Sequence, residues 1–327
     1  MPFWAPDDDD TSLASRPHPS SSAPVTKEKH DHPAVALPRR AAALVLAAAT
    51  ALVPLASSAV PKPSGSNLAK REDTKYFHEP WGSLALGHYD SRYFKEEVPY
   101  EQHRVVLRDL IRSYLTVMVN VGAETWIAHG TLLGWWWNGL IMPWDYDLDV
   151  QVSNATLQWM GDHLNRTEHS FNSSSGSGVV NKYILDVNPH HSDIDRGDGM
   201  NIIDARWIDM QNGMFVDITG VREREADRPG FWSCKNFHRY ASQDLWPLRH
   251  TEFEGVRALI PYSFEQILVD EYGAKSLVTE EHESHRWDRD IKQWVRMDAN
   301  DERRAKEEAR ERKRLEMIRD GRLKPDP

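Results

Sequence analysis

The chain has 327 residues, a formal net charge of −10 at pH 7 and a single cysteine, Cys234. This length allows one large domain or two small ones. The acidic balance argues against a general nucleic-acid binder, which would present a basic face, and the lone cysteine excludes a domain held together by its own disulfides.

The first 60 residues contain a polar tail and an apolar segment. Residues 1–40 are rich in Pro, Ser, Asp and His, which predicts a disordered, cytosolic tail. Residues 41–60 carry no charge, and about 20 apolar residues just span a bilayer, so we expect a transmembrane signal-anchor. Arg39 and Arg40 precede it, as the positive-inside rule prefers, although further cations follow. The alternative is a cleaved signal segment with small residues at 57–59.

Either arrangement delivers the remainder of the chain to the secretory lumen. Three sequons, at Asn154, Asn165 and Asn172, support that location. We therefore expect a single-pass type II protein of the Golgi or ER membrane, or a secreted protein if the segment is cleaved. Residues 61–98 are expected to be a stem and a lead-in segment ahead of the folded part.

The folded part is predicted to begin with a helix over residues 99–121. Pro99 suits the first turn, apolar residues recur at helical spacing, and Gly122 is a suitable stop. A short buried strand is expected at 125–128.

Gly130 and Thr131 follow this strand, at the expected start of an aromatic helical piece. A glycine turn there lets backbone N–H groups approach a phosphate, whose charge a helix N-terminus favours. His129 either donates a hydrogen bond to such a phosphate or is a buried histidine without chemistry. Of the three tryptophans at 135–137, we expect one or two in the core and one under a base or sugar ring.

Residues 141–152 are predicted to form an acid strand. Asp145, Asp147 and Asp149 occupy alternate positions, so in a strand they point to one face. Three carboxylates on one face repel one another unless a hard cation such as Mg²⁺ or Mn²⁺ lies between them. A solvated acidic edge is the alternative, which the apolar flanks of the segment disfavour.

A helix at 154–167 and a strand at 182–187 are expected next. A hairpin follows, with strands at 201–209 and 214–219 joined through an Asn-Gly turn.

Asp217 is a single acid among the apolar residues of the second hairpin strand. A buried carboxylate needs a partner, which is either a metal ion or a salt bridge to Arg206 or Arg222. Further on, a hairpin at 251–261 and a helix at 263–272 are expected, and residues 290–327 are predicted to be a charged, solvent-exposed helical extension.

Two motifs together resemble a known family. His-Gly-Thr-Leu-Leu-Gly at 129–134 and Pro-Trp-Asp-x-Asp-x-Asp at 143–149 are similar to the LicD/fukutin-related group of the nucleotidyltransferase superfamily. The triple tryptophan and the Met-Pro-Trp-Asp segment resemble the fungal branch linked to mannosylphosphorylation of N-glycans. The resemblance covers roughly residues 100–287. It implies an α+β fold, a nucleotidyltransferase-like mixed β-sheet with flanking helices, preceded by the N-terminal membrane anchor, with the catalytic domain at 99–289.

The resemblance also implies roles for individual residues. Asp147 and Asp149 match the metal-binding pair, and Asp217 matches the third carboxylate that arrives on a neighbouring strand. Asp145 either supports the metal ligands without binding the metal itself or contacts the acceptor. Lys235 and Arg249, near a Pro-Leu-Arg element, are candidates for binding the donor phosphates, with ordinary surface cations as the alternative.

Three functions fit these features. The first is a Mg²⁺- or Mn²⁺-dependent phosphotransferase that moves mannose phosphate from GDP-mannose onto an N-glycan mannose and releases a nucleoside monophosphate. The second is a sugar transferase with an Asp-x-Asp metal site, which would release a nucleoside diphosphate. The third is a non-catalytic partner of a Golgi transferase.

Overall fold

The computed structural model describes residues 75–323 except 84, 177 and 194–198. The predicted tail at 1–40, the predicted anchor at 41–60 and most of the predicted stem lie outside the described residues. Within the described part, no helix combines the length and the apolar character needed to cross a membrane.

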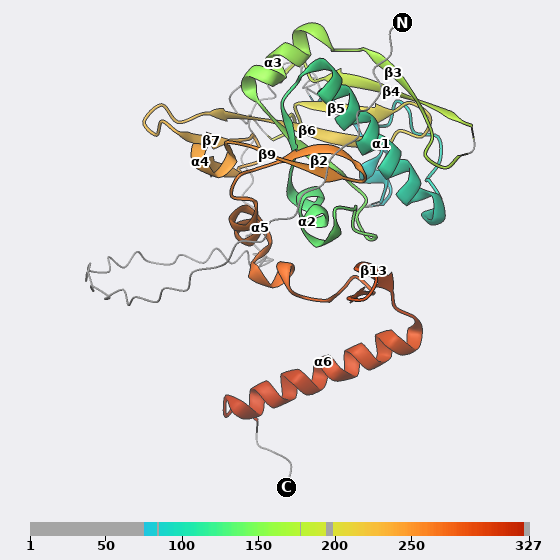
Figure 1. The fold of residues 1–327 in the computed structure, drawn as a ribbon, viewed down its shortest axis with the longest axis vertical. Coiled ribbons are helices and arrows are strands. Elements are labelled where there is room, and N and C mark those ends of the chain that lie inside the picture. The colour runs from blue at the N-terminus through green and yellow to red at the C-terminus, as the bar shows by residue number, and fades with distance from the viewer. Residues whose placement is uncertain (1–74, 84, 177, 194–198, 324–327) are drawn as a thin grey trace, which may run out of the picture. The chain divides into compact units, whose positions relative to one another are not determined.

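An eight-stranded, curled mixed sheet forms the centre of the fold (Figure 1). Its main path runs β1-β2-β6-β5-β4-β3, and β7 and β8 extend it beyond β6. Strands β2 and β6 are parallel, and the other neighbours are antiparallel. The strands are β1 (Thr125–Ile127), β2 (Asp149–Ser153), β3 (Glu168–Asn172), β4 (Val180–Val187), β5 (Ala205–Asp209), β6 (Phe215–Glu223), β7 (Phe231–Ser233) and β8 (Arg239–Ala241). The predicted α+β class and mixed sheet with flanking helices are confirmed.

Helices α1 (Tyr100–Val121) and α3 (Asn154–His163) pack on one face of this sheet, and Figure 1 shows α1 lying across β5 and β6. Trp207 is central to that face, because its Nε1 donates to Ser113 of α1 at 3.0 Å. Helix α3 approaches β6 so closely that a Cβ on Gly220 would lie 2.5 Å from the Leu157 side chain. The predicted apolar stripe of α1 therefore lies in the core.

The lead-in segment, residues 75–98, packs against the described domain instead of standing apart as a stem. Phe77, Tyr89 and Asp90 are buried, and Tyr89 forms a β-bridge with Met214. Within it, a 3-10 helix, η1, spans Ala85–His88.

The other face of the sheet carries polar residues. Since side chains alternate along a strand, the face opposite α1 carries Asp149, Arg206 and Asp217.

The acid segment is shorter as a strand than predicted. Helix α2 (His129–Asn138) ends at Gly139, whose φ of 75° is left-handed, and a loop continues to Leu148. Strand β2 begins only at Asp149, because β1 and β6 offer pairing partners from Val150 and Asp149 onward. Asp145 and Asp147 therefore lie in the loop, and the prediction of a strand from residue 141 was wrong.

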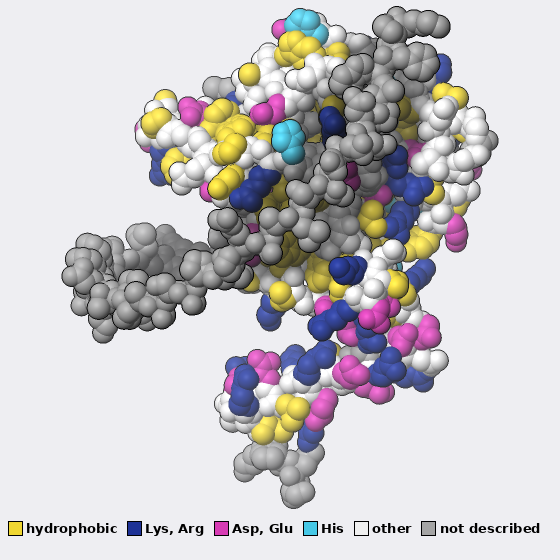
Figure 2. Space-filling model, in the orientation of Figure 1, with side chains coloured by type: hydrophobic (Ala, Val, Ile, Leu, Met, Phe, Trp, Pro, Cys, Tyr) yellow, Lys and Arg dark blue, Asp and Glu magenta, His cyan; other side chains and the backbone are white. Residues whose placement is uncertain are grey.

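The remaining elements follow β8. They are α4 (Ser242–Leu245), the hairpin β9 (Arg249–Phe253) and β10 (Val256–Ile260), α5 (Phe264–Tyr272), the 3-10 helix η2 (Ala274–Leu277), the small sheet β11 (Glu281–His282), β12 (His285–Asp288) and β13 (Gln293–Arg296), and α6 (Ala299–Arg319). The charged helix starts later than predicted, after Asp298, whose carboxylate accepts from two backbone N–H groups. Figure 2 shows cationic and acidic side chains interspersed along it.

Candidate functional site

A cavity of about 480 Å³ lies where α2, the following loop and β2 meet. We call it the acid cavity; its walls include Gly130, Asp145, Asp147, Asp149, Tyr272 and Lys275. Its size is within the range of small-molecule sites, about 300–1,000 Å³.

Asp149 and Asp217 lie side by side at one end of the sheet. They are register partners on the parallel strands β2 and β6, and the Asp217 N–H donates to the Leu148 carbonyl at 2.8 Å. Partners on adjacent strands lie about 4.8 Å apart and point to the same face. The structure therefore brings together the two carboxylates that are 68 positions apart in the chain.

Burial and mutual repulsion raise the pKa values of two carboxyl groups in the acid cavity. Burial, with the charges of Asp147 and Asp217, raises the pKa of Asp149 to about 7, although the charge of His129 opposes that rise. Burial and a hydrogen bond with the Asp147 side chain raise the pKa of Asp145 to about 9. In the part of the chain that the structure describes, no lysine or arginine forms an ion pair with Asp145, Asp147 or Asp149. A bound divalent cation would relieve this excess of negative charge.

Gly130 is required by the close approach of α2 to the acid loop. A Cβ at this position would lie 3.1 Å from the Asp145 Oδ2 atom, tighter than ordinary packing. Thr131 is buried, and its hydroxyl accepts the N–H of Asp149 at 2.9 Å. The predicted turn thus lies beside the acids, and Thr131 ties the helix start to β2.

His129 is occupied by internal partners. Its Nδ1 lies 2.9 Å from Glu271 Oε2, and its Nε2 lies 3.3 Å from the Gln151 amide nitrogen. Trp126 donates to Gln151 Oε1, which fixes the amide nitrogen toward His129. Burial lowers the pKa of His129, but the hydrogen bond and charge of Glu271 outweigh it and raise that pKa. This placement favours a structural role for His129 over a role as hydrogen-bond donor to a substrate phosphate.

His129, His238 and Glu271 also form the one group of candidate metal ligands found by distance among the described residues, within 4.8 Å of one another. The set of two imidazoles and one carboxylate suits zinc. However, the directed hydrogen bonds of His129 to Gln151 and Glu271 already organise this cluster, and His238 contacts the thiol of Cys234 at 3.3 Å. We assign it no metal.

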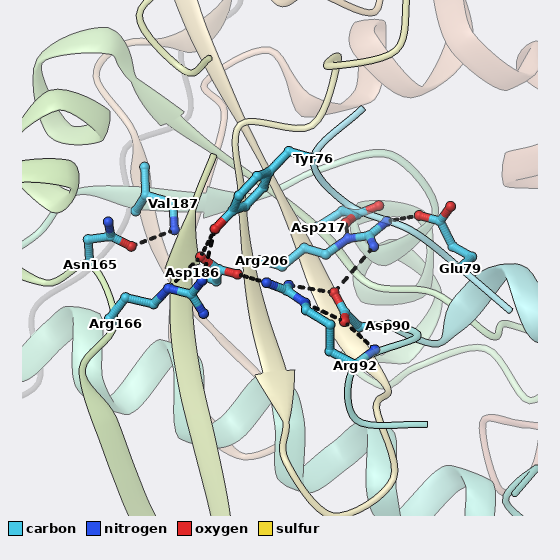
Figure 3. A network of polar contacts seen from close by, with 10 residues as sticks. All are labelled: Tyr76, Glu79, Asp90, Arg92, Asn165, Arg166, Asp186, Val187, Arg206 and Asp217. Atoms are coloured by element: carbon cyan, nitrogen blue, oxygen red, sulfur yellow. Dashed lines mark hydrogen bonds and ion pairs between the residues drawn. The ribbon is translucent and has the colours of Figure 1, made fainter. Parts of the chain in front are cut away.

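Asp217 is held by an arginine from the neighbouring strand (Figure 3). Arg206 Nε donates to Asp217 Oδ1 at 2.8 Å, and its Nη2 donates to Glu79 of the lead-in segment at 2.6 Å. Burial, with smaller contributions from the charges of Asp147 and Glu79, raises the pKa of Asp217, and Arg206 opposes that rise. The salt bridge to Arg206 was one of the two predicted partners. Because Arg206 takes one carboxylate oxygen, the other remains for a cation, an arrangement typical of metal ligands oriented by a second residue.

The two cations predicted to bind the donor phosphates lie elsewhere. Lys235 is 1 % exposed, and its Nζ pairs with Asp204 at 2.9 Å. Arg249 lies over the ring of Tyr262, 4.2 Å from its centre, in a separate hollow. The structure does not bring either side chain to the acid cavity. Both are explained by local partners that the sequence pattern did not reveal.

Lys275 is the cation that the fold does place at the acid cavity. It is exposed on η2, directly after α5. Tyr272, one turn earlier, also lines the cavity, where burial and nearby carboxylates raise the pKa of its hydroxyl. Sequence reasoning missed both residues, because they lie more than 120 positions after the acid motif and only the fold returns them to it.

Tryptophans form the opposite wall. Trp137, Trp144 and Trp294 line the acid cavity, and the Trp294 ring contacts the other two, with Trp137 and Trp294 centred 4.7 Å apart. Trp135 instead donates to Thr251 and packs against Phe264. The expected division of the triple tryptophan between core and ligand cavity agrees with this arrangement.

Comparison with known proteins gives the same family as the motifs. Residues 122–263 match the family described as LicD/FKTN/FKRP, nucleotidyltransferase domain. The chain is 29 % identical over 186 residues to Mannosyltransferase regulator 4 of Saccharomyces cerevisiae, covering 56 % of this chain and 16 % of that protein. It is 35 % identical over 176 residues to Mannosyltransferase regulator 14 of the same yeast, covering 50 % and 18 %.

The chain thus spans less than a fifth of the length of these two relatives. The matched family segment contains α2, the acid loop, β2 and β6, and hence all four acids considered above. Residues 122–263 are therefore similar to the nucleotidyltransferase domain of the LicD family, and the similarity to yeast mannosyltransferase regulators supports the fungal branch linked to mannosylphosphorylation.

Proposed function

We propose that the chain is a metal-dependent phosphotransferase. It moves a sugar phosphate, mannose phosphate from GDP-mannose, onto a hydroxyl of an N-linked mannan and releases a nucleoside monophosphate. The observation that carries this proposal is the register pairing of Asp149 with Asp217 beside the loop acids Asp145 and Asp147.

The donor atoms fit Mg²⁺ or Mn²⁺. Asp147, Asp149 and Asp217 offer only carboxylate oxygens, which these hard cations prefer. A fit is also supported by the raised pKa of Asp149, since buried carboxylates without a cation retain protons. When bound there, such an ion would neutralise charge on the donor diphosphate and stabilise the oxygen that leaves.

The chain's own residues perform the other tasks. Arg206 holds the Asp217 carboxylate in place, and Gly130 lets the start of α2 approach the phosphates. Lys275 contributes a positive charge on the far wall, where it would bind the donor phosphate.

Asp145 is the group that we assign to proton transfer. It lies beside the metal-ligand positions, whereas Asp217 is engaged by Arg206. The acceptor oxygen forms a bond to the distal phosphorus while the bond from that phosphorus to the bridging oxygen breaks. With a divalent cation bound at the neighbouring carboxylates, Asp145 would be ionised, and the hydroxyl proton would pass to its carboxylate oxygen while the nucleoside monophosphate leaves with the bonding electrons.

A donor panel tests this function. The purified full chain would be incubated with Mn²⁺, a mannan oligosaccharide and GDP-mannose, UDP-sugars or CDP-alcohols in turn, and the released nucleotide identified. We expect a nucleoside monophosphate together with phosphorylated oligosaccharide. Release of a nucleoside diphosphate would instead identify a sugar transferase.

A non-catalytic role is the second candidate, because both yeast relatives are named as regulators. In that case the domain would bind or stimulate a separate Golgi transferase. A strain lacking the gene for this chain would be complemented with Asp147→Asn/Asp149→Asn. We expect no recovery of glycan phosphorylation, whereas full recovery would establish the regulatory role.

We also propose a lumenal location in the Golgi or ER, with residues 41–60 as the membrane anchor. The sequons at Asn165 and Asn172 are exposed, as carriers of glycans must be, whereas Asn154 is half-buried at the start of α3. Sensitivity of the electrophoretic mobility to an N-glycosidase, lost in Asn165→Gln/Asn172→Gln, would test this location.

A further inference from the structure

A second cavity lies on the other side of the acid loop. Its volume is about 320 Å³, and it lies between the start of α1, the loop before β2 and the strands β12 and β13. We call it the α1 cavity. Three residues line both cavities: Met142, Asp145 and Trp294. A molecule in the α1 cavity would therefore lie next to whatever occupies the acid cavity, with the Asp145 carboxylate between them.

Two polar atoms in the walls of the α1 cavity have no partner in the described structure. His103 Nε2 and Trp294 Nε1 are buried without a hydrogen bond, and their residues are only 5 % and 9 % exposed. A buried polar atom without a partner costs about 1–3 kcal/mol, so most proteins satisfy such groups. Both atoms belong to side chains that line the α1 cavity; because the atoms are closed to water, the hydroxyl groups of a ligand would reach them after a small shift of these side chains.

The other lining residues fit a carbohydrate. Tyr100, which is 45 % exposed, offers an aromatic ring on which the C–H face of a sugar ring can pack. Glu101, Arg104 and Arg296 offer charged acceptors and donors at the opening, and Arg296 lies over the Tyr100 ring at 5.2 Å. Mixed apolar walls with a few placed polar groups are typical of small-molecule sites.

The wall of the α1 cavity that adjoins the acid loop is fixed by an aromatic contact. The His103 ring packs against Tyr146, with ring centres 4.2 Å apart, and Tyr146 lies between Asp145 and Asp147 in the chain. A ligand in the α1 cavity would therefore contact a side chain that packs directly against the loop that carries Asp145 and Asp147.

We propose, on the basis of the proposed function, that the α1 cavity is the acceptor site of this domain. It takes a neutral hexose unit of an oligosaccharide and directs one hydroxyl past Asp145 toward the acid cavity. The donor lies in the acid cavity with its phosphates near Lys275. The two substrates thus enter from opposite sides of the acid loop and meet at Asp145.

Binding measurements separate this site from catalysis. The full wild-type chain, which cannot carry out the transfer with one substrate alone, would be titrated with a mannose trisaccharide and, separately, with GDP-mannose in the presence of Mn²⁺. In that background we expect Arg104→Ala and Tyr100→Ala, both at exposed positions, to weaken trisaccharide binding about tenfold or more. Arg257→Ala, an exposed arginine of a different hollow, is the matched control and should bind the trisaccharide as the parent does.

Each other outcome overturns the assignment. Equal trisaccharide binding in parent, Arg104→Ala and Tyr100→Ala would place the acceptor elsewhere, and absence of binding to the parent would remove the site altogether. Weaker binding of GDP-mannose but not of trisaccharide would make the α1 cavity part of the donor site. Failure of the proposed function is recognised separately, as absence of nucleotide release by the wild-type chain, because trisaccharide binding is measured without turnover.

Discussion

Asp149 and Asp217 occupy equivalent places on two neighbouring strands but have opposite surroundings. Asp217 faces Arg206, which is itself held by Glu79 and lies within ion-pair distance of Asp90. Asp149 lies near Asp147 and has no lysine or arginine partner among the described residues; the charge of His129 lowers its pKa, but burial and the neighbouring carboxylates outweigh it. The fold therefore neutralises one side of the site with its own arginine and leaves the other side with excess negative charge. That asymmetry is expected of a site that an external cation completes.

The largest effect should come from removing the charge on the uncompensated side. Asp149→Asn and Asp147→Asn keep the side-chain shape but remove a metal-binding oxygen charge. Mutation of residues that only orient metal ligands typically lowers metal affinity or activity about 10–100-fold. Loss of a ligand itself should therefore reduce the rate of nucleotide release by more than that. Asp162→Asn on the exposed surface of α3 is the control. Activity within twofold of wild type in Asp149→Asn would contradict the assignment.

Removing the chain's own cation should act on stability first. Arg206→Met leaves Asp217, Glu79 and Asp90 without their shared partner in a buried network (Figure 3). Breaking a buried ion pair in this way costs about 3–5 kcal/mol, measurable by urea unfolding. Arg166→Met, whose exposed guanidinium pairs with Asp186 at the edge of the same network, should cost much less. An Arg206→Met protein as stable as wild type would show that Asp217 does not depend on Arg206.

The far wall of the acid cavity provides a smaller test. Lys275→Ala removes an exposed cation that lines the acid cavity, and we expect the KM for the donor to rise about tenfold, the effect of one charge-assisted hydrogen bond. Arg249→Ala is the matched comparison, because that cation lies in a separate hollow. If Arg249→Ala raises the KM and Lys275→Ala does not, the donor phosphates lie outside the acid cavity.

The pH dependence of stability should show the smallest effect. A carboxyl whose pKa is raised in the native state, as that of Asp145 is to about 9, holds a proton that the unfolded chain releases near its usual pKa of about 4. Its contribution is therefore lost as pH rises from about 4 to about 9. In EDTA, the melting temperature of wild type should fall more steeply over this range than that of Asp145→Asn, by a few degrees. Parallel profiles would contradict the raised pKa.

Much of the site could be predicted from short patterns, because its parts are local. The acids at 145, 147 and 149 stand out by their alternation, although only Asp149 lies in a strand, and Asp217 stands out as one acid in an apolar strand. The alternation of side chains then places Asp149 and Asp217 on one face once the strands pair. The order of α1, β1, α2 and the later hairpins follows from the same local signals, whereas the α+β class was implied by the family resemblance.

What could not be predicted depends on partners distant in the chain. The strand limit at Asp149 is set by how far β1 and β6 extend, which no pattern within 141–148 encodes. Lys275 and Tyr272 reach the acids only because α5 packs beside α2. Lys235 and Arg249 carry the positive charge that phosphate binding needs. However, Lys235 forms an ion pair with Asp204, and Arg249 packs over the ring of Tyr262. The lead-in segment carries no strong periodicity, yet it supplies Glu79 and Asp90.

Binding of Mn²⁺ tests most directly whether the uncompensated side of the site holds a cation. The full chain would be titrated into Mn²⁺ at about pH 8, where bound metal competes best with protons, and free Mn²⁺ followed by electron paramagnetic resonance. We predict that wild type removes the free-ion signal and that Asp149→Asn does so about tenfold less effectively or worse. Equal binding by the two proteins, or none by either, would contradict a metal site between Asp149 and Asp217.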